Sequence, residues 1–151
     1  MKLILFLLIS IISTASAQLK DLEWTLPDAW ELSNKKSMMR IATFVVKEKK
    51  ELAVSASKFG GKAGGELANV NRWRGQLGLK PVSAEELKKT LEVIETKVGK
   101  AKLVDISNDK NQMLAVILPY NNSTYFFKLM GAKVDVSKQK ENMVKLVKSL
   151  K

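Results

Sequence analysis

The sequence predicts an α+β domain in which an antiparallel β-sheet is flanked by helices. Three observations lead to this class. Several segments are rich in β-branched and aromatic residues and alternate in polarity, two internal segments have helical spacing, and the last segment carries an apolar helical stripe. The segments follow the order strand-rich, helix, helix, strand-rich, helix, without repeats or low-complexity stretches. We therefore expect one folded domain over residues 18–151.

Residues 1–17 have the pattern of a secretory signal peptide. Lys2 precedes an apolar run over 3–12, and a small-x-small cleavage motif at 15–17 stands before Gln18. The run is shorter than the about 20 residues of a membrane span, so we expect no transmembrane segment after cleavage. A retained N-terminal anchor is the alternative. We expect an exported protein, periplasmic or extracellular, that is soluble after cleavage. The absence of Cys favours a bacterial source.

The first half of the domain predicts a short strand followed by a hairpin. Trp24 and Trp30 stand on either side of Pro27, a pattern typical of a short strand and a corner. Residues 37–47 are rich in strand-forming types. After a charged turn, apolar and small residues alternate over 52–57, which predicts a half-buried partner strand.

A glycine-rich turn and two helices follow. Residues 60–65 hold four glycines in six positions, and helical spacing then runs from Glu66 until Gly78 and Pro81 end it. A capping box over 83–86 predicts a second, short helix that ends near Thr90, with Val82 and Leu87 as its hydrophobic staple.

The last part of the chain predicts four strands and a helix. Two strands over 91–98 and 101–106 turn about Gly99, and residues 113–118 are apolar on both faces, as a central strand would be. A turn at 121–123 leads to a last strand over 124–130. The closing helix is expected to start near Ser137, and its apolar stripe consists of Met143, Leu146, Val147 and Leu150.

The composition excludes several kinds of active site. The 151 residues include no His and no Cys, which removes Ser-His-Asp and Cys-His catalysis, thiolate nucleophiles, and imidazole or thiolate metal sites. No nucleophile is paired with a base in the remaining residue types. We therefore expect no catalytic residues, no metal site and no cofactor, and a hydrolase that works through carboxylates is the least favoured alternative.

The chain is strongly basic, with 26 Lys and Arg against 15 Asp and Glu and a net charge of +11. Cleavage after residue 17 would remove Lys2 alone and leave +10. Only Arg40, Arg72 and Arg74 are arginines, whereas proteins that read nucleic-acid sequence favour Arg for base contacts, so no sequence-specific nucleic-acid partner is expected. The lysines indicate a solvated surface, or attraction to an anionic membrane or envelope polymer.

The candidate binding site is the glycine-rich turn together with the helix that follows it. Free N–H groups at a helix start can hold an anion, although neither a P-loop nor a dinucleotide fingerprint matches. An exposed Trp73 beside Arg72 would be an interaction anchor. The alternative is structural, with Trp73 packed on the sheet and Asn69 and Asn71 bonded to turn backbone. The candidates are Gly60, Gly61, Lys62, Gly64, Gly65, Asn69, Asn71, Arg72, Trp73, Arg74 and Gln76.

These segments carry a resemblance to a known group of proteins. Gly64-Gly65, followed over 68–77 by Ala-Asn-Val-Asn-Arg-Trp-Arg-Gly-Gln-Leu, resembles a motif of an uncharacterised family of exported bacterial proteins. Weaker matches cover 26–30, 39–44, 113–115 and 125–131. Many relatives look like lipoproteins, and this chain departs from them because it lacks Cys.

At the level of the fold, the Pro–Trp opening, the Phe-Phe-Lys-Leu-x-Gly strand end and the closing helix resemble the PsbP-like superfamily. The resemblance implies an α/β/α sandwich and an accessory or assembly role without catalysis. We therefore expect a non-catalytic extracytoplasmic binding or accessory protein whose partner is an unknown protein. An envelope protein that binds anions, such as acidic glycans or lipid head groups, is the alternative.

Overall fold

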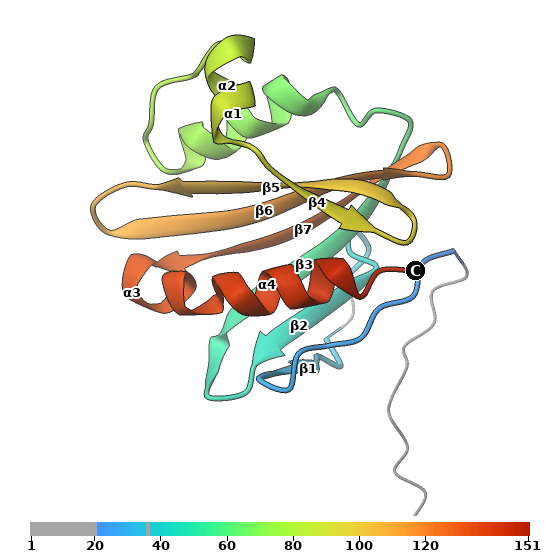
Figure 1. The fold of residues 1–151 in the computed structure, drawn as a ribbon. Coiled ribbons are helices and arrows are strands. Elements are labelled where there is room, and N and C mark those ends of the chain that lie inside the picture. Colours follow the sequence, from blue (N-terminus) through green and yellow to red (C-terminus); the bar gives the residue numbers. More distant parts are fainter. Residues whose placement is uncertain (1–20, 36) are drawn as a thin grey trace, which may run out of the picture.

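The computed structural model describes residues 21–35 and 37–151, so the predicted signal peptide lies outside the described residues. One seven-stranded sheet runs through the domain in the order β1-β2-β3-β7-β6-β5-β4, and all neighbouring strands are antiparallel (Figure 1). Its strands are β1 (Trp30–Leu32), β2 (Ala42–Val46), β3 (Lys49–Gly60), β4 (Glu92–Thr96), β5 (Gly99–Ser107), β6 (Asn111–Tyr120) and β7 (Ser123–Ala132).

Helices cover both faces of the sheet, which confirms the predicted α+β class and the sandwich arrangement. The helices are α1 (Glu66–Gln76), α2 (Ala84–Thr90), α3 (Lys133–Val136) and α4 (Lys140–Lys148), with a 3₁₀ turn at Ser137–Gln139. Helices α1 and α2 lie on one face, and α3 and α4 lie on the other (Figure 1). Of the helices in the described part of the chain, none is both long and apolar enough to cross a membrane.

The core has two layers, one on each side of β6. Leu114, Val116 and Leu118 belong to the layer under α4, and the residues between them belong to the layer under α1 and α2. The predicted central strand with two apolar faces is therefore confirmed. The stripe of the last helix is confirmed as well, because its members Met143, Leu146, Val147 and Leu150 are fully buried.

Two predicted boundaries are wrong by several residues, and the strand predicted over 52–57 extends at both ends to become β3, Lys49–Gly60. The strand predicted over 37–47 begins only at Ala42, because Ala42 is the first residue paired with β3 and the backbone before it turns where Arg40 N donates to Ser37 O. The last helical region begins at Lys133 rather than near Ser137, since the chain turns directly after β7 and buries Val136 in the core. Gly131, near the end of β7, allows close packing here, because a Cβ at this position would lie 2.8 Å from Leu52 Cδ1 and 3.4 Å from Val136 Cγ2.

The helix layer of α1 and α2 covers only part of its face of the sheet. The buried cluster beneath these helices contains residues of β5, β6 and β7 and none of β1, β2 or β3. In Figure 1 the two helices lie over β5 and β6, and β1 and β2 lie well away from them. Where this layer ends, the face of β3 and the part of β7 around Lys128 lie beside α1 rather than beneath it, and this edge positions the candidate site.

Candidate functional site

A cleft of about 430 Å³ lies at the edge of the helix layer, between α1, the strands β3 and β7, and the turn before β2. We call it the cationic cleft, because Arg40, Arg72 and Lys128 all line it. Each comes from a different part of the chain. The other lining residues are Met39, Ser55, Ser57, Phe59, Ala63, Asn69, Trp73, Gln76 and Phe126.

The register of two strands builds the floor of the cleft. Ser55 lies opposite Lys128, and Ser57 lies opposite Phe126. Because side chains two residues apart in a strand share a face, these four side chains point to the same side of the sheet, toward α1. Lys128 is the charged member of the apolar run Tyr125–Met130 and is half-buried. An amine therefore stands on the floor, where a strand of a closed sandwich would carry an apolar side chain.

The three cations of the cleft lie close enough to influence one another. Burial lowers the pKa of Lys128 below its ordinary value, and the positive charges of Arg40 and Arg72 lower it further. Among the described residues, no carboxylate forms a salt bridge with any of the three. Three converging cations without a carboxylate favour a negatively charged occupant.

Aromatic side chains form one wall of the cleft. The ring of Phe126 lies 5.4 Å from Trp73 in an edge-on contact and 5.6 Å from Phe59, measured between centroids. Trp73 is only 4% exposed, so it packs on the sheet, and the idea of an exposed tryptophan anchor is wrong. Its position follows from helical spacing, since Val70 and Trp73 in α1 and Leu77 directly after it form one buried stripe. Phe59, at 39% exposure, is the ring that solvent reaches.

Asn69 joins the cleft to the glycine-rich turn. It is 2% exposed, and its Nδ2 donates to Ala63 O at 2.8 Å and to Gly65 O at 2.7 Å. Arg72 Nη1 donates to Asn69 Oδ1 at 2.9 Å, so a buried amide orients the guanidinium at the cleft. Asn69 and Arg72 therefore act as one hydrogen-bonded unit, in which the first shapes the turn and the second presents a charge.

Two of the predicted site residues lie outside the cleft and hold the connection between α1 and α2. Asn71 Nδ2 donates to Val82 O at 3.0 Å, and Asn71 Oδ1 accepts from Val82 N at 2.8 Å. Arg74 Nε donates to Lys80 O at 2.7 Å. These contacts give the two side chains a structural role, as the alternative interpretation expected for Asn71.

The glycine-rich turn packs against the β6–β7 turn rather than into the cleft. Gly61 N donates to Asn122 O at 2.8 Å, and Thr124 Oγ1 donates to Gly61 O at 2.7 Å. A second hollow of about 850 Å³ lies here and is lined in part by Gly61, Lys62 and Gly65. Gly60 ends β3, and Gly64 lies in the turn.

The start of α1 is a poor place for an external anion. Glu66 is the first residue of the helix, and its Oε2 accepts from Lys102 Nζ at 2.5 Å. A carboxylate in the first turn already interacts with the positive end of the helix dipole. The cationic cleft is therefore a better candidate for an anion site than the glycine-rich turn.

The structure thus divides the predicted site residues and adds others. Asn69, Arg72, Trp73 and Gln76 line the cleft together. Sequence reasoning missed Arg40, Lys128 and the two serines. The available signals were one Lys inside an apolar strand and the small number of arginines, but only the strand register and the turn before β2 place these residues together. In the described part of the chain, no three Asp or Glu side chains gather as metal ligands do.

Comparisons with known proteins support the fold. No protein-family model matches the chain, and no curated protein matches it in sequence. The solution structure of the cyanobacterial PsbP of Synechocystis sp. PCC 6803 is similar, with a TM-score of 0.52 and 12% identity, over 87% of this chain and 86% of that one. This likeness supports the PsbP-like fold that the sequence resemblance implied. The motif over 64–77 as the mark of a family stays a prediction.

Two further solved structures are similar at lower scores. A protein of Bacteroides thetaiotaomicron VPI-5482 has a TM-score of 0.49 and 10% identity, over 86% of this chain and 44% of that one. LpqN of Mycobacterium tuberculosis, described as involved in cell envelope biogenesis, has a TM-score of 0.47 and 14% identity, over 85% and 81%.

Proposed function

We propose that this protein is an exported, non-catalytic binding protein and that the cationic cleft is its ligand site, which takes the anionic group of a ligand. The observation that carries the proposal is the convergence of Arg40, Arg72 and Lys128 on one cleft without a carboxylate partner among the described residues. The proposed export rests on the signal-peptide pattern of residues 1–17.

The physical basis is the cost of holding like charges together. Two guanidinium groups and a half-buried ammonium group repel one another, and burial removes part of the water that would screen them. An anion in the cleft would replace this repulsion with charge-assisted hydrogen bonds, which are stronger than neutral ones. Guanidinium groups suit carboxylate and phosphate oxygens in particular, because they can donate two parallel hydrogen bonds.

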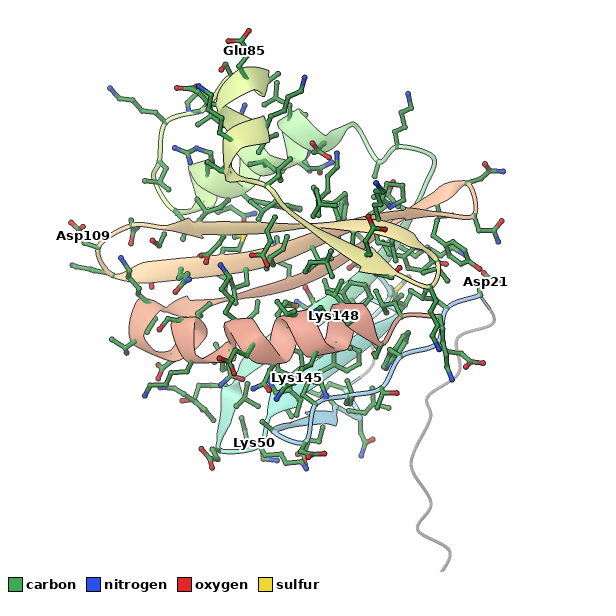
Figure 2. The ribbon with its side chains drawn as sticks, in the orientation of Figure 1. Asp21, Lys50, Glu85, Asp109, Lys145 and Lys148 are labelled. Atoms are coloured by element: carbon green, nitrogen blue, oxygen red, sulfur yellow. The ribbon has the colours of Figure 1, made fainter. Side chains whose placement is uncertain are left out.

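The alternative of a surface that attracts an anionic polymer has less support. Many lysines pair with carboxylates, for example Lys49 with Asp135 and Lys140 with Asp105. In Figure 2, acidic Glu85 and Asp109 project from separate sides of the molecule, away from the basic Lys145 on α4. Positive and negative side chains are interspersed, whereas a long polyanion needs a continuous basic stripe. The cationic cleft is a local concentration of charge and favours a local anionic group.

The experiment that tests the proposal is an NMR titration of the isotope-labelled protein over 18–151 with inorganic phosphate and, separately, with acetate, at low ionic strength. We expect saturable shifts at the amides of Ser57, Arg72 and Lys128. Arg40→Ala should weaken phosphate binding roughly tenfold, the loss of one charge-assisted contact. Arg40 is the preferred variant because its side chain is exposed and belongs to neither buried cluster, whereas Arg72 also bonds the buried Asn69.

Arg74→Ala is the matched control. This variant removes one positive charge, as Arg40→Ala does. Arg74 lies on α1 outside the cleft and bonds Lys80 O, so the affinity of Arg74→Ala for phosphate should stay within about twofold of the wild type. Shifts that do not saturate with either anion, or that respond equally to the Arg40 and Arg74 variants, would overturn the cleft as an anion site.

A further inference from the structure

We propose that the cationic cleft selects a small organic anion with an aromatic or similarly flat apolar body, in preference to an inorganic ion. The proposal rests on the proposed function, because it names the ligand class of the same cleft. What carries it is the arrangement of two kinds of side chain around one volume, with Arg40, Arg72 and Lys128 supplying charge and the ring cluster Phe59–Phe126–Trp73 supplying an apolar wall.

The rim of the cleft exposes apolar surface that the core does not use. Phe59 is 39% exposed, and Met39, on the turn before β2, is 73% exposed. Both line the cleft. Neither belongs to the two buried clusters of the core, so packing of the core does not explain why apolar residues stand at these positions. Apolar side chains that gather beside converging charges, rather than singly over the surface, indicate a surface that binds something.

The ring cluster is preorganised. Phe126 contacts both Phe59 and Trp73, and Trp73 is fixed because it is buried between α1 and the sheet. Phe126 and Phe59 therefore present a wall whose orientation is set before a ligand arrives. When a flat apolar group stacks on Phe59, the protein side chains lose little conformational entropy. An inorganic ion would contact the cations and leave this wall in water.

The size of the cleft limits the ligand. A volume of about 430 Å³ is at the lower end of the range of small-molecule sites, which is about 300–1,000 Å³. It has room for one ring with an acidic substituent and its hydration. Ser57 and Gln76 add polar side chains between the charged and aromatic sides. The ligand class is therefore an aryl or comparably flat apolar carboxylate or phosphate monoester.

The test compares two probes of equal charge. Phenyl phosphate and methyl phosphate are titrated by calorimetry or NMR at a pH of about 8, where both monoesters are dianions. We expect phenyl phosphate to bind at least about tenfold more tightly than methyl phosphate. The stacking and burial of one ring are sufficient for a change in affinity of this size. Arg40→Ala should weaken both probes by a similar factor.

Variants at the rim separate the ring contact from the charge contact. Phe59→Leu keeps apolar volume but removes the ring, and it should reduce the advantage of phenyl over methyl phosphate without changing the affinity for methyl phosphate. Phe59→Ala should do the same more strongly. Val93→Ala is the control, because Val93 is also an exposed apolar residue, at 54% exposure, but it lies on β4 and does not line the cleft.

Three outcomes contradict the inference, and only the third also contradicts the proposed anion site. Equal affinity for the two probes, with both lost in Arg40→Ala, overturns the aromatic selectivity and leaves the anion site intact. Tighter binding of phenyl phosphate that is insensitive to both Phe59 variants places the ring elsewhere and also overturns it. If neither probe binds, and phosphate and acetate fail as well, both proposals are wrong.

Discussion

At the scale of a single residue, Lys128 of the proposed ligand site has a lowered pKa. Its amine is half-buried on the sheet and faces two guanidinium groups, and both conditions lower its pKa. The folded state therefore releases this proton at a lower pH than the unfolded chain does. Between the two pKa values the unfolded chain binds more protons, so this group makes stability rise as the pH increases through that window.

We predict that Arg72→Ala raises the pKa of Lys128 toward its ordinary value, because it removes one of the two positive charges that lower it. NMR of the Lys side-chain nitrogen during a pH titration measures the change directly. Arg74→Ala should leave the pKa of Lys128 where it is, since Arg74 is not among the causes of its shift. Bound phosphate should raise this pKa in the wild type, and a fall on binding would contradict the cleft as the anion site.

At Gly65 the backbone, rather than a contact, requires glycine. Its φ of 91° and ψ of 156° lie in a region that residues with a Cβ scarcely populate, and no atom lies within 4 Å of where a Cβ would be. We predict that Gly65→Ala lowers the free energy of unfolding by about 1–3 kcal/mol through backbone strain alone. Gly60→Ala, also with open space but without a positive φ, should change it much less. Chemical denaturation of the two variants checks this difference.

At the scale of one element, the different sides of α1 make different kinds of contact. Val70, Trp73 and Leu77 pack on the sheet, and Asn71 and Arg74 bond the backbone that leads to α2. Arg72 and Gln76 face the cleft. A side chain every 100° around a helix explains how neighbours in sequence divide between core, connection and ligand site. The motif over 68–77 is therefore only partly functional in our proposal.

Helix α4 tests the packing of the opposite face. Leu146 is fully buried in the larger cluster, while its neighbour Lys145 is exposed. We predict that Leu146→Ala lowers the free energy of unfolding by about 2–5 kcal/mol through lost burial and a residual cavity. Lys145→Ala should stay within about 0.5 kcal/mol, as is usual for surface positions. Thermal or urea unfolding measures both, and equal stability of the two variants would place the stripe outside the core.

At the scale of the whole molecule, the cleft exists because the two faces of the sheet are covered unequally. The first described segment and the last residue meet just beyond the C-terminal end of α4, where Glu23 N donates to Lys151 O at 2.8 Å and Lys151 N donates to Glu23 O at 3.1 Å (Figure 1). This strand-like contact holds the end of the chain next to the N-terminal segment, and α4 itself covers its face with buried side chains. On the other face the helices stop above β7, and the open floor beside them carries Lys128.

Export is the prediction that concerns the full chain. The apolar run and the small-x-small motif at 15–17 predict cleavage directly after Ala17. Mass spectrometry of the protein produced with its complete N-terminus in its native host should find Gln18 as the first residue in the periplasmic or extracellular fraction. A variant with Ala17→Pro, which blocks the cleavage motif, serves as the control and should keep the N-terminal segment. Intact Met1 on the wild-type protein in the cytoplasm would contradict the prediction.

The sequence by itself determined the features that depend on neighbours along the chain. Helical spacing placed α1, α2 and the stripe around Leu146, the capping box at Ser83 and Glu86 started α2, and alternation identified β3. The tertiary structure alone decided the cleft. Strand register brought Ser55 beside Lys128, and the turn at Ser37–Arg40 brought Arg40 to the rim. Periodicity and capping are local and repeat every few residues, whereas strand order and the extent of a helix layer depend on packing between distant segments.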